Sequence, residues 1–96
     1  MPYHVYVLEC SDGTYYTGVT RNVERRFQQH QAGVHPKAYT FTRRPVKLKW
    51  AVSFTRIDHA IEVEKQIKRW SSKKKAALIE NDWDLISQLA KKDFSK

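Results

Sequence analysis

The sequence predicts a single α+β domain, sandwich-like, in which a small, mostly antiparallel sheet of three strands is flanked by helices. Two observations carry this prediction: strand-like segments rich in β-branched and aromatic residues, and segments with apolar residues at helical spacing. The elements follow one another in the order ββαβααα. With 96 residues, 41% hydrophobic and 29% charged, the chain has room for one modest core and lacks the composition of a disordered protein. We therefore expect one domain over residues 1–96.

The first two strands are expected to form a hairpin. Segments 3–10 and 14–20 are rich in Tyr, Val and Thr, and the turn-forming residues Ser-Asp-Gly stand between them. A three-residue loop ending in a left-handed glycine places Tyr6 opposite Gly18, with Tyr16 on the same face. Gly18 then leaves an empty space opposite Tyr6. A two-residue loop would reverse the alternation, so this register depends on the turn.

Two further elements follow the hairpin. A helix is expected over residues 23–32, because Asn22 is a favourable N-cap and Gly33 suits the left-handed residue that ends a helix. The third strand is expected after the next loop, because apolar residues stand at every second position from Val46 to Phe54.

Three helices are expected after the third strand. The first is expected to have Asp58 as its N-cap and to run to about residue 70. The second is expected to begin at Ser71 or Ser72 and to run to about residue 79. A C-terminal helix and tail are expected over residues 81–96.

The charge balance favours a nucleic-acid partner. Eighteen Lys and Arg against ten Asp and Glu give a net charge of +8 and a pI of about 9.8. A protein that is merely basic is the alternative. No apolar run reaches the roughly 20 residues of a membrane span, and the N-terminus lacks the pattern of a signal peptide. With a single cysteine, Cys10, these features lead us to expect a cytoplasmic protein without disulfides.

Helical spacing singles out one arginine and one glutamate. Arg26 borders the apolar face of the first helix, which also carries His30, whereas Arg25 points away. Glu64 falls in the middle of the apolar stripe of the second helix, whereas Glu62 does not. A carboxylate there is costly unless it is paired, hydrogen-bonded or bound to metal. The pattern alone leaves three explanations open. Glu64 forms an ion pair with Arg26, its side chain reaches solvent at the edge of the helix, or it has a functional role.

The tyrosines also have an alternative interpretation. Aromatic residues favour strands, so Tyr6 and Tyr16 beside a glycine fit ordinary core packing as well as a site.

Taken in order, these residues resemble the GIY-YIG nuclease superfamily, in particular its small, stand-alone, single-domain bacterial members. The resemblance covers roughly residues 3 to 80 through the segments VYVLECSDGTYYTGVT, VERRFQQH, RRPVKLKW and EKQIKR. His-Val-Tyr at 4–6 stands where the family has GIY, and Tyr-Thr-Gly at 16–18 where it has YIG. The first glycine and the isoleucine are absent, but no residue expected to do chemistry is missing. His30 falls where several members carry a histidine, and we count it among the catalytic residues.

The resemblance implies a metal-dependent endonuclease that hydrolyses phosphodiester bonds in nucleic acid, in DNA rather than RNA, with a structure-specific role in repair or recombination. It implies Tyr6 as general base, Tyr16 as its assistant, and Arg26 as the group that stabilises developing charge. Glu64 is implied as the only protein ligand of one Mg²⁺ or Mn²⁺ ion. Gly18 is implied to clear a path opposite Tyr6 for a phosphate or water.

A basic and aromatic loop, joined by a lysine-rich helix start, is expected to bind the nucleic acid. Cations would contact phosphates and aromatic rings would contact bases. The residues concerned are Lys37, Tyr39, Arg43, Arg44, Lys73 and Lys74. Two alternatives remain: a non-catalytic DNA- or RNA-binding module of the same fold, and a subunit that is active only with a protein partner docked near Trp83. The oligomeric state is not predicted.

Overall fold

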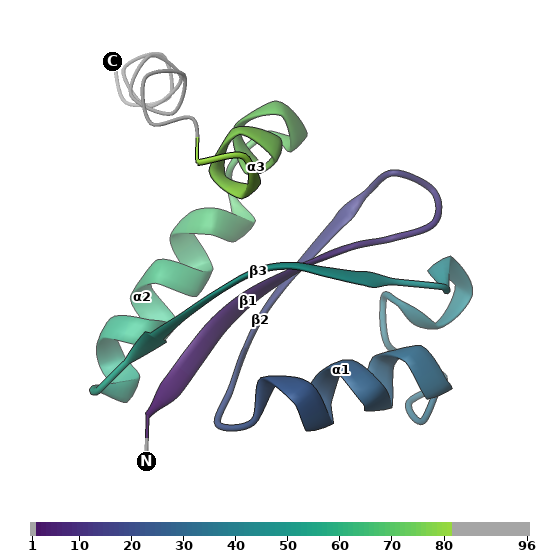
Figure 1. Ribbon diagram of the computed structural model, residues 1–96, viewed down its shortest axis with the longest axis horizontal. Coiled ribbons are helices and arrows are strands. Elements are labelled where there is room, and N and C mark those ends of the chain that lie inside the picture. The colour runs from purple at the N-terminus through teal and green to yellow at the C-terminus, as the bar shows by residue number, and fades with distance from the viewer. Residues whose placement is uncertain (1, 82–96) are drawn as a thin grey trace.

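The computed structural model describes residues 2–81 (Figure 1). Its elements are β1 (Tyr3–Glu9), β2 (Tyr15–Thr20), α1 (Val23–Ala32), a short 3-10 helix η1 (Phe41–Arg43), β3 (Lys47–Phe54), α2 (Ile57–Lys68) and α3 (Ser72–Ile79). This is the predicted order, with η1 added in the loop after α1. The predicted C-terminal helix, with Trp83, lies outside the described residues. None of the described helices is long and apolar enough to cross a membrane.

The three strands form one antiparallel sheet in the order β2-β1-β3, so β2 and β3 are its edges. The hairpin has the predicted loop: Gly13 has a φ of +83°, and Tyr6 pairs with Gly18. The alternation predicted for the third strand is interrupted. The pairing of β1 with β3 shifts by one residue between Leu48 and Trp50, so these two side chains lie on opposite faces.

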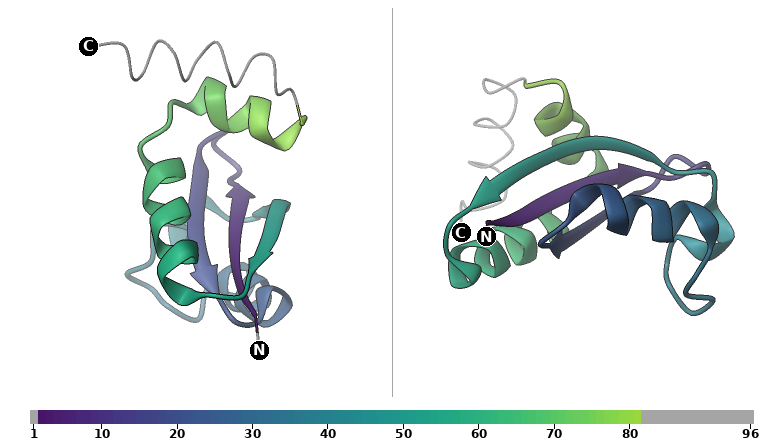
Figure 2. Two further views of the ribbon diagram at one scale, coloured as in Figure 1. Left: turned by 90° about the vertical axis from the view of Figure 1, so that its left-hand side faces the viewer. Right: turned by 60° about the horizontal axis from the view of Figure 1, so that its bottom comes forward.

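The sheet lies between α1 on one face and α2 with α3 on the other, and Figures 1 and 2 show this layering. Val5 and Val7 of β1 pack in one buried cluster with Ala60 of α2. Tyr6, which points the opposite way, packs in a second cluster with Phe27 of α1. The core is therefore two thin layers, and Tyr6 belongs to the α1 layer.

The helix starts follow the predictions except at α2. Asn22 and Ser71 cap α1 and α3, since each side chain accepts a backbone N–H from the first turn. The N-cap of α2 is Arg56 rather than Asp58. The Asp58 carboxylate is instead bound by the Arg56 guanidinium, with N–O distances of 3.0 and 2.9 Å. The predicted start was therefore two residues late.

Candidate active site

Tyr6 lies at the centre of the site, on the middle strand of the sheet. Its side chain is 1% exposed, and the end of its ring lies over Gly18 of β2. A Cβ atom at position 18 would stand 2.8 Å from Cε1 of Tyr6 and closer still to its hydroxyl. The space that was expected to admit a water or phosphate is therefore filled by the phenol itself. Gly18 allows the ring of Tyr6 to cross β2.

The Tyr6 hydroxyl begins a buried chain of hydrogen bonds. Tyr6 Oη lies 3.1 Å from His30 Nε2, and His30 Nδ1 lies 2.7 Å from Thr40 Oγ1. All three side chains are buried. Thr40 stands directly before η1 and was not predicted, because it is one of several polar residues in a loop. Only the folded chain brings it to His30.

Burial determines which of these hydrogen-bonded side chains carry a proton. Burial, followed by the charge of Arg26, lowers the pKa of His30, so the imidazole is neutral at pH 7. Burial, followed by the charge of Tyr16, raises the pKa of Tyr6 well above its ordinary value of 10.0, and Arg26 opposes this shift. The phenol is therefore protonated at neutral pH. We assign its O–H as the donor to His30 Nε2, and this assignment puts the imidazole proton on Nδ1.

Arg26 is directed toward the site, as helical spacing predicts. It is half-buried, whereas Arg25 is exposed. Its charge lowers the pKa of both Tyr6 and His30. Within residues 2–81 no carboxylate pairs with it. The Arg26–Glu64 ion pair that the sequence left open is therefore not formed.

Glu64 is buried in α2 at 8% exposure, whereas Glu62 on the same helix is exposed. Its partner is Lys68, one turn further along: Lys68 Nζ stands 2.9 Å from Glu64 Oε2. The hydrogen bond and the charge of Glu64 raise the pKa of Lys68, so the two side chains form a close ion pair. Lys68 Nζ also lies 5.9 Å from the centre of the Tyr16 ring. The ion pair of this buried carboxylate thus has its ammonium group beside Tyr16.

The Glu64 carboxylate fits a single hard divalent cation. Residues 2–81 contain no group of three or more His, Cys, Asp or Glu side chains that could hold a metal. A buried carboxylate suits an ion such as Mg²⁺, which keeps most of its waters and needs few protein ligands. Lys68 has to leave Oε2 for an ion to bind there.

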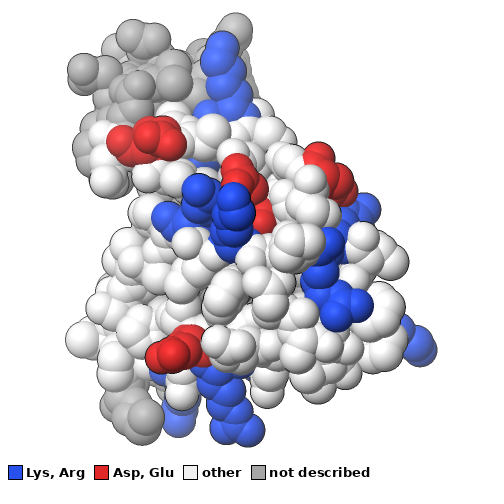
Figure 3. Space-filling view, turned by 45° about the vertical axis from the view of Figure 1, so that its right-hand side comes forward, with Lys and Arg blue, Asp and Glu red and all other residues white. Residues whose placement is uncertain are grey.

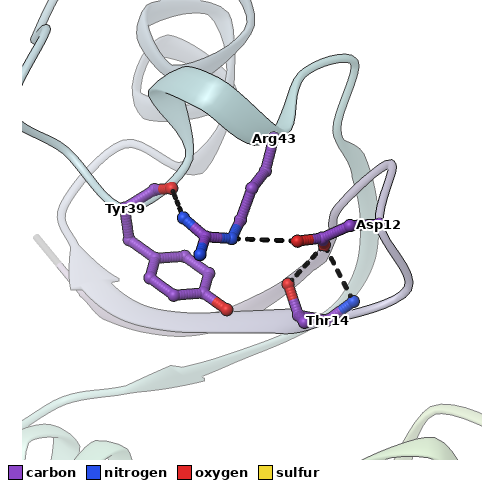
Figure 4. A network of polar contacts seen from close by, with 4 residues as sticks. All are labelled: Asp12, Thr14, Tyr39 and Arg43. Carbon is purple, nitrogen blue, oxygen red and sulfur yellow. Dashed lines mark hydrogen bonds and ion pairs between the residues drawn. The ribbon is translucent and has the colours of Figure 1, made fainter.

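Tyr16 is held in a stack of rings. Its ring centre lies 5.0 Å from that of His30 and 6.2 Å from that of Tyr39, which is inclined by only 24°. Arg43 covers Tyr39 at 3.9 Å and donates hydrogen bonds to the Tyr39 carbonyl and to Asp12 (Figure 4). Tyr39 and Arg43 were expected to contact nucleic acid. In the structure they contact each other and position Tyr16.

The other residues expected to bind nucleic acid differ in exposure. Lys37 and Lys73 are exposed, and Arg44 is exposed while its guanidinium packs on an aromatic ring of the same loop. The prediction for Lys74 is wrong. Its side chain is fully buried, with the ammonium 4.1 Å from the centre of the Trp70 ring, so it cannot reach a bound phosphate.

A groove of about 330 Å³ beside Tyr16 contains two lysines that the sequence did not single out, Lys68 and Lys75. Burial, followed by the charge of Lys68, lowers the pKa of Lys75. The three consecutive lysines of α3 gave no signal of which one faces the site. Only the packing of α3 decides that it is Lys75 and not Lys74.

Comparison with known proteins places the chain among small single-domain relatives. Residues 2–77 match the sequence family described as the GIY-YIG catalytic domain. A UPF0213 protein of Halobacterium salinarum is 50% identical over 76 residues, covering 79% of this chain and 97% of that protein. A UPF0213 protein of Syntrophus aciditrophicus is 43% identical over 79 residues, covering 82% of this chain and 91% of that protein.

Two solution NMR structures are also similar. One is a UPF0213 protein of Bacillus halodurans, with 38% identity and a TM-score of 0.54, covering 83% of this chain and 84% of that one. The other is a protein of E. faecalis, with 30% identity and a TM-score of 0.59, covering 84% of this chain and 85% of that one.

Proposed function

This chain belongs to the GIY-YIG domain family, and we propose that it is a metal-dependent endonuclease that hydrolyses phosphodiester bonds in nucleic acid, in DNA rather than RNA. The observation that carries the proposal is the convergence of Tyr6, Arg26 and Glu64. They come from β1, α1 and α2, and the charges of Arg26 and Glu64 both act on the Tyr6 phenol. The charges of the proposed phosphate-binding cation and of the proposed metal-binding carboxylate therefore both lie within electrostatic reach of the proposed base.

In this proposal Tyr6 takes a proton from the attacking water. A phenol with a raised pKa is a poor base unless its own proton can leave. His30 Nε2, neutral and 3.1 Å away, accepts that proton as the water proton arrives at Tyr6 Oη. The resulting hydroxide attacks the phosphorus, and the bond to the leaving oxygen breaks. Thr40 Oγ1 accepts the Nδ1–H of His30 throughout and keeps the ring oriented.

The remaining residues act on the phosphate. Arg26 binds two phosphate oxygens with its forked guanidinium, a geometry that lysine does not offer. Tyr16 hydrogen-bonds the water or the phosphate. Glu64 is the protein ligand of one Mg²⁺ or Mn²⁺ ion, which when bound polarises the phosphate and stabilises the leaving 3′ oxygen.

The substrate is expected to be recognised by shape. Contacts with phosphates carry no sequence information, and this small domain has few elements that could enter a groove. Lys37, Arg44 and Lys73 are the exposed cations proposed to contact the backbone. A structure-specific role in DNA repair or recombination, a cytoplasmic location and a protein partner stay predictions.

A non-catalytic nucleic-acid-binding module of the same fold is the second candidate. The ion pair of Lys68 with Glu64 favours it, because the ammonium already occupies the carboxylate oxygen that a metal needs. The two candidates differ in whether a divalent ion can displace Lys68 when substrate is present.

The test is cleavage of a labelled panel of single-stranded, duplex and branched DNA and RNA, with Mg²⁺, Mn²⁺ or EDTA. The matched variants are Glu64→Gln, which changes the buried carboxylate, and Glu62→Gln, which changes an exposed one on the same helix. We expect cleavage that requires metal, survives in Glu62→Gln and is lost in Glu64→Gln. Cleavage that survives in Glu64→Gln would contradict the assigned site. Tight binding without cleavage of any substrate would support the binding module.

A further inference from the structure

The candidate site lies midway along an edge strand, and a basic hollow adjoins each end of that strand. The groove with Lys68 and Lys75 is lined by residues 15–17, at the start of β2. A pocket of about 400 Å³ is lined by Thr20, at the end of β2, and by residues that follow it. Gly18, beneath the Tyr6 phenol, lies between the two.

Three arginines line the pocket at the end of β2: Arg21, Arg25 and Arg26. Within the described part of the chain none of them pairs with a carboxylate. Arg21 is held in place, because its guanidinium donates to Tyr3 Oη at 2.6 Å and lies 4.8 Å from the centre of that ring. Arg26 is also one of the proposed active-site residues.

The groove at the start of β2 has a second, independent set of polar groups. Lys75 forms no ion pair with a described residue, and its ammonium stands close enough to Lys68 for the two charges to repel. Thr17 lines the same groove at 2% exposure, and its Oγ1 has no hydrogen-bond partner among the described residues. That oxygen is enclosed by the protein, so the lysines are the groups of this groove that can reach a bound phosphate.

The positively charged side chains of each hollow lie close enough to repel one another. Over the face shown in Figure 3, Lys and Arg side chains form separate patches with Asp and Glu between them, so the net charge of +8 is not one continuous stripe there. Cations without a carboxylate partner, here the three arginines of the pocket and Lys75 of the groove, repel one another or a neighbouring cation unless an anion binds beside them. Both hollows therefore suit an anion rich in oxygen acceptors, such as a phosphate group.

The length of β2 selects among phosphate ligands. At about 3.3 Å per residue, the strand residues that line the groove, 15–17, stand roughly 10–17 Å from Thr20, which lines the pocket. One phosphate ion cannot contact both ends, whereas a chain of several nucleotides can. We propose that the sugar–phosphate backbone of the substrate runs along β2, with one phosphate bound by Arg21 and Arg25 and another by Lys75. The phosphate to be cleaved lies between them, at Tyr6 and Arg26.

This inference rests on the proposed function but is tested by binding and not by cleavage. The probe is a short fluorescein-labelled DNA, single-stranded or duplex, titrated with protein in EDTA at several salt concentrations. The variants are Arg21→Gln, Arg25→Gln and Lys75→Gln. The control is Lys47→Gln, which removes one positive charge from β3, the opposite edge of the sheet. Thermal unfolding of each variant checks that it is folded.

We expect each of the three variants to weaken binding about fivefold, and to reduce the slope of log K against log salt by about 0.7–0.9 for each lost phosphate contact. Lys47→Gln should change neither. Arg21→Gln and Lys75→Gln should combine additively, because they act at separate ends of β2. Because Arg21 packs on Tyr3, Tyr3→Phe provides a second variant that releases the guanidinium without changing the charge, and it should weaken binding as well.

Three outcomes would overturn the inference. The first is that all four charge variants lose the same amount of affinity and show the same fall in the slope of log K against log salt. Binding would then depend on the overall positive charge of the protein and not on these positions. The second is that inorganic phosphate alone binds with high affinity at constant ionic strength while the variants bind DNA normally, which would show isolated ion sites. The third is that the wild-type protein binds no nucleic acid, which would also remove the proposed function. If the variants change binding as expected but the wild-type protein cleaves no substrate, the result would contradict the proposed function and leave this inference standing.

Discussion

Replacing Gly18 with alanine should destabilise the protein, although removing a glycine from a strand usually stabilises it. The gain from reduced chain entropy is about 0.4–1 kcal/mol. Against this, the new methyl group would stand 2.8 Å from Tyr6 Cε1 and closer to the hydroxyl, in a side chain that is 1% exposed and cannot move into solvent. Overpacking of this kind costs about 1–3 kcal/mol, and displacing the phenol also weakens its bond to His30. We expect a net loss of about 1–2 kcal/mol.

A double-mutant cycle isolates this effect. Urea unfolding would be measured for the wild type, Gly18→Ala, Tyr6→Leu and the double variant, with the slope checked for two-state behaviour. In the Tyr6→Leu background the added methyl has no phenol to meet, so its cost should vanish or change sign. The expected coupling is about 1–3 kcal/mol. Equal costs of Gly18→Ala in the two backgrounds would refute the role assigned to Gly18.

Three further predictions follow from the same contacts. Thr40→Val should cost about 1–3 kcal/mol in urea unfolding, because it leaves His30 Nδ1 buried without a partner, whereas Thr40→Ser should cost much less. The free energy of unfolding should fall as the pH drops below 6.5, the ordinary histidine pKa, because the lowered native pKa of His30 means that only the unfolded chain takes up that proton. His30→Gln should reduce this dependence; an unchanged slope would contradict it. Lys68→Met should tighten Mn²⁺ binding about fivefold in calorimetry without nucleic acid, because the ammonium no longer competes at Glu64; equal affinity would contradict the competition.

The parts of the site that depend on local geometry could be predicted from the sequence. The Ser-Asp-Gly loop determines the hairpin register, and the register places Tyr6 opposite Gly18. Helical spacing distinguishes Arg26 from Arg25 and Glu64 from Glu62, because each pair differs by 100° or more around its helix.

The parts that depend on contacts between distant elements could not. Thr40 meets His30 only because the loop before η1 folds back on α1. Lys75 faces the site and Lys74 does not because of how α3 packs, and the short run of lysines carries no apolar stripe to show it. The shift in strand pairing at Leu48 likewise could not be predicted, because no glycine or proline in the sequence marks it.

The protonation state of Tyr6 depends on two opposing effects. The charge of Arg26 alone would lower the pKa of the phenol. In the structure burial outweighs that charge and raises the pKa, so the neighbouring imidazole becomes the necessary proton acceptor.

The most direct test of the account is the single-turnover cleavage rate of Tyr6→Phe with saturating metal, beside Tyr15→Phe as a control in the same hairpin. Substrate binding in EDTA would be measured for both variants. If Tyr6 is the general base, Tyr6→Phe should cleave about 100-fold or more slowly with unchanged binding, and Tyr15→Phe should cleave at the wild-type rate. Cleavage by Tyr6→Phe at the wild-type rate would contradict the account, because the phenol would then serve only to pack the core.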